Sequence, residues 1–206
     1  MRSIIIEDHK KALTLTKRQR ELIVGLLLGD GHLETQNNRT YRLKVEHGIK
    51  QKEYVDWLYE NFSEWVHQPP KARTKDSFGK EIISYGFTTY SSGFLRFYAQ
   101  QFYSDKEKII PRVIHTLLSP LAIAIWFMDD GSWKSSAHRT YIIHALGYRK
   151  SELNLVRKVF QKKFGIRVGI HKQYERWRIY VYSDSSERFR KLIEPHVIPS
   201  LKYKLG

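Results

Sequence analysis

The chain has 206 residues, 41% of them hydrophobic, with a formal net charge of +15. It is long and apolar enough to bury a core of one or two domains. The absence of cysteine excludes disulfides and thiolate metal sites, which favours an intracellular location, either a bacterial cytoplasm or an organelle. The apolar run Ile4–Ile6 is too short for a signal peptide or a membrane span, so no membrane partner is expected.

The excess of positive charge indicates a polyanionic partner. The sequence has 36 Lys and Arg against 21 Asp and Glu, and 14% of its residues are aromatic. Lysine could serve solubility alone, and an anionic membrane surface would attract the same charge. Basic residues interleaved with aromatic ones, with no basic tail, favour a folded surface that binds nucleic acid.

The first half of the chain alternates helices with pairs of strands. Thr16 is a plausible N-cap for an apolar helix over 16–29, which ends before Gly31. Helical spacing of apolar residues predicts a second helix from Lys52 to Val66, closed by two prolines. Strands are expected near 32–36, 41–47, 71–75 and 81–88, and a last helix over 92–102.

A connector over residues 104–120 follows, in which Ile110-Pro111 and Ser119-Pro120 flank a short helix. We place the domain boundary there, between an N-terminal repeat over 1–103 and a C-terminal repeat over 121–206.

The second half repeats the first. The run Leu22–Gly31 has its counterpart in Ala122–Gly131, and Arg39-Thr40-Tyr41 reappears one hundred residues later as Arg139-Thr140-Tyr141. Strands near 133–136, 140–146, 166–172 and 177–182, with helices near 151–163 and 185–193, give an α+β fold of two similar halves. Gly25, Gly29, Ala122 and Ala124 would let the two apolar helices cross closely.

Both apolar helices end in Asp-Gly, at Asp30 and Asp130. One such ending simply terminates a helix and turns the chain. Two of them, after buried helices in a basic repeat protein, predict paired carboxylates that repel unless a cation lies between them. Oxygen ligands suit Mg²⁺, and metal-assisted hydrolysis of a phosphodiester follows from such a site.

The runs Ile23–Gly31 and Ile123–Gly131 resemble the two motifs of the LAGLIDADG homing endonucleases in their double-motif, monomeric form. The connector Lys108–Pro111 and the ending Ile198–Leu205 extend the resemblance over nearly the whole chain. It implies two pseudo-symmetric αββαββα repeats that form a DNA-binding saddle, packed through the two motif helices. It also implies double-strand cleavage of a long DNA target with short 3′ overhangs, using Mg²⁺ or its substitute Mn²⁺.

The resemblance also implies roles for individual residues. Asp30 and Asp130 match the metal-binding acids, assisted by the carbonyls of Gly29 and Asp129. Lys108 and Lys204 match basic residues that organise water near the scissile phosphates, although exposed lysines are common. Glu46 and His47 match polar positions beside the active site, whereas the second half has Leu146 and Gly147 at the same offset, so the two centres are expected to be unequal.

Strand alternation sorts the candidate DNA contacts by face. Tyr41, Leu43 and Val45 are expected to face the core, which leaves Arg42, Lys44 and Glu46 on the other face. For any single residue, a solvated strand face is nearly as good an explanation. The predicted DNA contacts are Arg39, Arg42, Lys44, Lys71, Arg73, Lys75, Lys80, Lys134, Arg139, His144, Arg167, His171, Arg178, Tyr180 and Tyr182.

Two other functions stay open at this point. An RNA-binding intron maturase, with or without DNA cleavage, would take intron RNA as its partner. A transcription regulator that kept the scaffold for binding alone would be expected to have lost an acid, and both are present. Retention of Asp30 and Asp130 favours the endonuclease.

Overall fold

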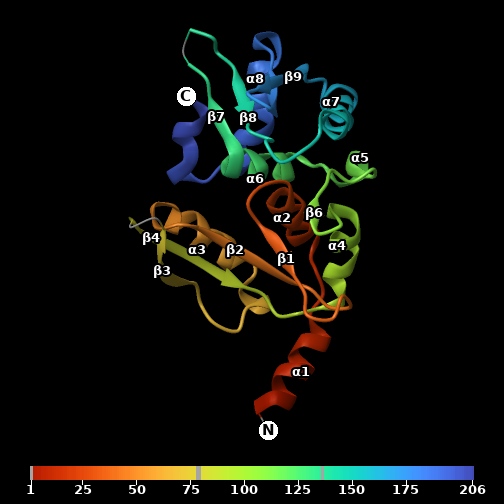
Figure 1. Ribbon diagram of the computed structural model, residues 1–206, viewed down its shortest axis with the longest axis vertical. Helices are drawn as coiled ribbons and strands as arrows, with labels where there is room; N and C mark the ends of the chain where they lie inside the picture. Colours follow the sequence, from red (N-terminus) through yellow and green to blue (C-terminus); the bar gives the residue numbers. More distant parts are fainter. Residues whose placement is uncertain (1, 78–79, 136) are drawn as a thin grey trace. The chain divides into compact units, whose positions relative to one another are not determined.

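The computed structural model describes residues 2–77, 80–135 and 137–206, and it forms two compact units (Figure 1). The first unit contains the chain up to residue 20 together with 30–99, and the second contains 21–29 together with 100–206. Among the described residues, no helix combines the length and apolar composition that a bilayer crossing requires.

The first unit is built on a four-stranded antiparallel sheet in the order β1-β2-β4-β3. Helix α3 packs against β2 and β4, and a helix not expected from the sequence, α1, precedes α2. The elements are α1 (Arg2–Ala12), the start of α2 (Lys17–Leu28), β1 (His32–Glu34), β2 (Arg42–Gly48), η1 (Ile49–Gln51), α3 (Lys52–Asn61), η2 (Ser63–Trp65), β3 (Lys71–Ser77), β4 (Lys80–Thr88), η3 (Gly93–Leu95) and the start of α4 (Arg96–Phe102).

Residues alternate between the two faces of this sheet as the sequence predicts. Leu43 and Val45 are fully buried on the face that α3 covers, whereas Arg42 is exposed on the other. The pairing of Lys71 with Gly86, and of Gly86 with Glu46, puts Lys71 on the same open face as Glu46. This face therefore collects the charged side chains of the sheet.

The second unit repeats the same sheet order, as β7-β8-β10-β9, which confirms the repeat. Helices α7 and α8 pack against strands of this sheet. The elements are the rest of α2 and of α4, β5 (Tyr103–Ser104), β6 (Glu107–Lys108), α5 (Ile114–Leu117), α6 (Pro120–Asp130), β7 (Gly131–Trp133), β8 (Tyr141–Ile143), α7 (Lys150–Phe164), β9 (Val168–Gln173), β10 (Arg176–Val181), α8 (Ser183–Ile193), η4 (Glu194–His196) and η5 (Pro199–Leu205).

The two apolar helices, α2 and α6, approach closely within the second unit. A Cβ atom placed on Gly25 would lie 2.5 Å from the Cβ of Ile125 and 2.6 Å from the carbonyl oxygen of Ala122. Only glycine leaves room for this contact, since a bonded carbon would overlap both atoms. Eight consecutive residues of α6, from Leu121 to Met128, are buried. The predicted close crossing is therefore confirmed.

The offset of one hundred residues does not hold through the strands, and this part of the prediction is wrong. Leu33 pairs with Leu43, ten residues on, whereas its counterpart Trp133 pairs with Tyr141, eight residues on. The hairpin of the second unit is two residues shorter. The matching Arg-Thr-Tyr triplets at 39–41 and 139–141 are therefore not structurally equivalent.

We expect Gly25→Ala to lower the free energy of unfolding by about 1–3 kcal/mol, because the added methyl overpacks the helix contact. The change is measured from urea unfolding followed by circular dichroism. Gly147→Ala is the matched control, since nothing lies within 4 Å of its added Cβ. An equal effect of both substitutions would contradict this account of the crossing.

Candidate active site

Asp30 follows Gly29 in the turn that ends α2, and it lines a hollow of about 440 Å³ on the first unit. Its carboxylate lies 3.5 Å from Nδ1 of His47, whose side chain is only 3% exposed. His47 projects from β2 and packs 5.1 Å, between ring centroids, from Tyr54 of α3. Glu46, the preceding residue, lines the same hollow. The structure thus brings Asp30, Glu46 and His47 together.

A chain of ion pairs continues from this hollow across the open face of the sheet. Lys44 lies 3.2 Å from Glu46, and Arg42 lies 2.8 Å from Glu34. Partial burial by itself raises the pKa of Glu34. The hydrogen bond and charge of Arg42, with smaller contributions from His32 and Lys44, outweigh that effect and lower the pKa below its usual value. The carboxylate of Glu34 therefore stays ionised and orients Arg42.

Asp130 ends α6 in the second unit, where two groups hold it. The indole Nε1 of Trp126 donates to its carboxylate at 3.2 Å, and the backbone amide of His144 donates to its carbonyl at 3.0 Å. The ring of His144 in turn lies 3.2 Å from the hydroxyl of Ser132. Neither Trp126 nor Ser132 was among the predicted site residues.

Strand pairing changes the counterparts of Glu46 and His47. His32 pairs with Lys44, and the equivalent Ser132 pairs with Ile142, so the counterpart of Glu46 is His144 and that of His47 is Ala145. The earlier assignment to Leu146 and Gly147 is wrong, because it assumed hairpins of equal length.

The two predicted lysines have corresponding positions at the ends of the two motif helices. Lys108, from β6, donates to the carbonyl of Gly29 at 2.5 Å. Lys204, from η5, donates to the carbonyl of Asp129 at 3.2 Å and also to that of Met128. The carbonyls that end these helices have no amide partner within the helix. Each lysine therefore brings a positive charge to one helix terminus.

Asp129 lies at the close approach of the two motif helices. Its carboxylate packs against the α-carbon of Gly29, where a side chain on residue 29 would collide with it. The sequence predicted a contribution from the Asp129 carbonyl, which accepts from Lys204. Within the second unit, α6 therefore brings a carboxylate beside Asp130 to the end of α2.

Tyr148 is a structural residue of the site that sequence reasoning missed. Its hydroxyl donates to the carbonyl of Leu28 at 2.9 Å, at the last turn of α2. Burial, with smaller contributions from nearby Asp130, Tyr103 and Glu152, raises the pKa of Tyr148 far above its usual value. The phenol is therefore a permanent donor that holds the helix end just before Gly29.

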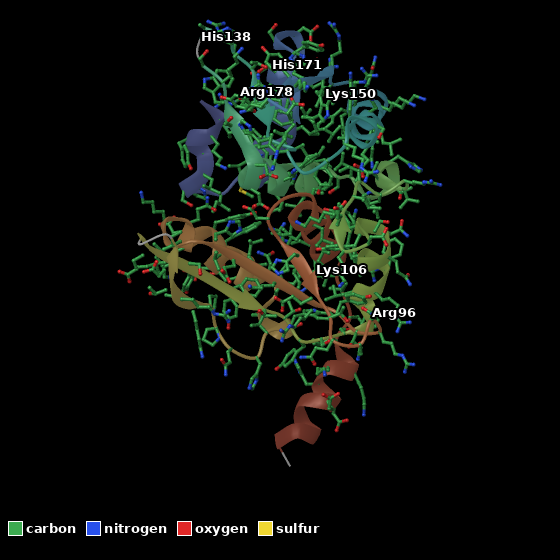
Figure 2. All side chains as sticks on the ribbon, viewed as in Figure 1. Arg96, Lys106, His138, Lys150, His171 and Arg178 are labelled. Atoms are coloured by element: carbon green, nitrogen blue, oxygen red, sulfur yellow. The ribbon has the colours of Figure 1, made fainter. Side chains whose placement is uncertain are left out.

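The predicted DNA contacts of the second unit form an aromatic and basic surface on its sheet. His171 stacks on Tyr180 with ring centroids 4.8 Å apart and planes at 7°, and Lys134 lies 5.3 Å above the Tyr180 ring. Arg167 pairs with Asp184 and lies 5.3 Å over Tyr182. Burial, followed by the charges of Arg178 and Lys134, lowers the pKa of His171, which favours the neutral imidazole. Figure 2 labels His171 and Arg178 in this unit.

The other predicted contacts lie in hairpin loops and on β3. Arg39 and Arg139 occupy the hairpin loops of the two sheets, with positive φ for Arg139 (38°). Arg73 pairs with Ser84 and is exposed. The side chains of Lys75 and Lys80 lie outside the described part of the structure.

Two sheets of the same strand order, an acid at the end of each motif helix and basic residues on the open faces define a protein that acts on nucleic acid. Residues 20–189 match the LAGLIDADG DNA endonuclease family, and the chain belongs to it.

The similar proteins include both endonucleases and maturases. The chain is 29% identical to a probable intron-encoded endonuclease 1 of Wickerhamomyces canadensis, over 98% of this chain and 90% of that protein. It is 30% identical to the cytochrome b mRNA maturase bI2 of Debaryomyces hansenii, over the whole chain and 79% of that protein. Its fold matches the homing endonuclease I-WcaI bound to its DNA recognition sequence, with a TM-score of 0.91 and 27% identity over 98% of this chain and 92% of that one.

Tyr148→Phe is expected to lower the free energy of unfolding by about 1 kcal/mol, because the carbonyl of Leu28 loses its buried donor. Thermal unfolding measures the loss. Tyr174→Phe provides the control, since Tyr174 is 90% exposed. Equal stability of the two variants would contradict the proposed role of the Tyr148 hydroxyl.

Proposed function

We propose that the protein is a site-specific homing endonuclease that cuts both strands of a long DNA target and leaves short 3′ overhangs. The observation that carries this proposal is the recurrence, at the two motif helices, of an aspartate beside a lysine-bound carbonyl. Asp30 follows Gly29, whose carbonyl accepts from Lys108, and Asp130 follows Asp129, whose carbonyl accepts from Lys204. DNA binding alone requires neither acid.

The proposed cofactor is Mg²⁺, with Mn²⁺ as a substitute. The donor set fits a hard cation, because Asp30 and Asp130 offer carboxylate oxygens and the carbonyls of Gly29 and Asp129 lie beside them in the chain. The side chain of Asp30 is 52% exposed, which leaves it accessible to a phosphate-bound ion. When bound, the metal would activate water and stabilise the departing oxygen.

The lysines and the strand residues complete the proposed chemistry. Lys108 and Lys204 hold positive charge at the helix ends, where a scissile phosphate gains negative charge as its bond breaks. His47, buried against Asp30, positions that carboxylate, and Glu46 lines the same hollow. The histidine that replaces Glu46 in the second unit, His144, brings an imidazole to the Asp130 side.

The open sheet faces are the proposed DNA-binding surfaces of a monomer. Arginine side chains such as Arg42 and Arg178 read guanine in the major groove, while lysines such as Lys71 bind phosphate as readily as base. The double-stranded target is supported by the resemblance to a DNA-bound homing endonuclease.

Splicing of intron RNA is the second candidate function, either alone or with cleavage. The similarity to the maturase of Debaryomyces hansenii extends over the whole chain at 30% identity. This similarity supports an RNA partner in addition to the proposed DNA target.

Asp30→Asn and Asp130→Asn are each expected to abolish double-strand cleavage while the protein still folds, because each removes a carboxylate charge without changing side-chain volume. The measurement is cleavage of a randomised duplex DNA library in Mg²⁺, followed by sequencing of the cut ends. Asp8→Asn serves as the control, since Asp8 is an exposed residue of α1 that pairs with Lys11. Specific binding without cuts in Mg²⁺ or Mn²⁺ would overturn the endonuclease proposal.

The unequal strand residues predict unequal cleavage of the two DNA strands. Glu46→Gln and His144→Ala should each slow one strand more than the other, by about tenfold or more if proton transfer is lost. Nicked circles would then accumulate from a supercoiled plasmid that contains the selected target. Linear product appearing without a nicked intermediate in both variants would exclude separate roles for these residues.

A further inference from the structure

A groove between α5 and α7 lies outside the site described above. It has a volume of about 210 Å³ and a mostly apolar floor formed by Ile114, Leu155 and Val159. Its rim consists of four cationic side chains and one histidine, namely Arg112, Lys158, Lys162, Lys163 and His115. Among the residues that the structure describes, no acidic side chain lines it. The groove therefore combines a recessed apolar floor with a positively charged edge.

The positive charge of this region is not balanced by neighbouring acids. Helix α7 contains five Lys and Arg residues and a single acid, Glu152. The carboxylate of Glu152 accepts from the backbone amides of Arg149 and Ile110, at the other end of the helix from Lys162. Within the described residues, Arg112, Lys158 and Lys162 form no ion pair. Such clustering costs stability through repulsion unless a polyanion binds.

The groove is separate from the sheet face proposed to bind DNA. Helix α7 packs on β9 and β10, and the buried Ile179 and Val181 alternate along β10 with Arg178 and Tyr180. Arg178 and Tyr180 therefore point away from α7, while Lys158 and Lys162 are exposed on α7. A duplex held on the open sheet face leaves this groove uncovered.

We propose that the α5–α7 groove binds a single-stranded segment of a folded RNA. The apolar floor takes an unstacked base, and the rim cations take the flanking phosphates. Bases of a perfect duplex are stacked and cannot enter a recess, whereas loops of folded RNA present splayed bases together with phosphates. An anionic membrane fits less well, because membrane-binding helices insert protruding apolar side chains, whereas the apolar side chains of the groove are recessed. The inference goes beyond DNA cleavage and deepens the second candidate function, on which it rests, by giving the proposed RNA partner a site of its own.

The test is binding of the full-length protein to a hairpin RNA library with a randomised ten-nucleotide loop, measured by filter retention at several salt concentrations. The variant is Lys158→Glu with Lys162→Glu, both exposed residues outside the cleavage site. We expect hairpin affinity to fall at least tenfold and the salt slope to fall by about 1.4, from two lost phosphate contacts. Cleavage of the DNA target should remain unchanged.

The control variant reverses the charge of two other exposed lysines of the same unit, by Lys191→Glu with Lys202→Glu. Its affinity for the hairpin RNA should stay within about twofold of that of the parent protein. Equal losses in the two double variants would overturn the proposal, because net charge alone would then explain binding. Stronger binding of a perfectly paired RNA, or equal binding of single-stranded DNA of the same loop sequences, would also overturn it. Because cleavage is measured separately, failure of RNA binding leaves the endonuclease proposal intact.

Discussion

The close contact of α2 with α6 is the constraint on which the rest of the site depends. Gly25 lets the backbone of α2 approach Ile125, and Gly29 leaves space for the carboxylate of Asp129. This contact fixes the carbonyls of Gly29 and Asp129, which in turn receive Lys108 and Lys204. Close packing therefore does more than bury apolar surface, because it sets the positions of the charged groups around each Asp-Gly ending.

Local sequence patterns predict most elements of this fold. The apolar run before Asp30 and the side chain of Thr16, which accepts from the amide of Gln19 at 3.2 Å, define the start and end of α2. What the repeat offset could not supply was the length of the second hairpin. Because the second hairpin loop is two residues shorter, each position after it corresponds to a residue 98 positions earlier and not one hundred. Glu46 therefore corresponds to His144 and not to Leu146.

Contacts between distant segments were beyond the reach of sequence patterns for a different reason. The hydroxyl of Tyr148 meets the carbonyl of Leu28 across 120 residues of chain. No local pattern distinguishes Tyr148 from the other tyrosines, because its partner is a backbone carbonyl, and every residue has one. The indole of Trp126, which donates to the Asp130 carboxylate four residues on, was similarly assigned to the motif helix by its apolar character alone. Trp126 therefore both packs in the core and donates a hydrogen bond to Asp130.

The two open sheet faces differ in chemistry although their strand order is the same. On the first, Glu34 and Glu46 pair with Arg42 and Lys44, so the base contact proposed for Arg42 would compete with its carboxylate partner at 2.8 Å. On the second, stacked His171 and Tyr180 replace such acids, and the imidazole is held neutral by burial and neighbouring cations. Preformed ion pairs orient a side chain but reduce the net charge offered to phosphate. The first face therefore suits directional contacts with bases, whereas the second offers stacked rings beside cations, of which Arg167 is paired with Asp184.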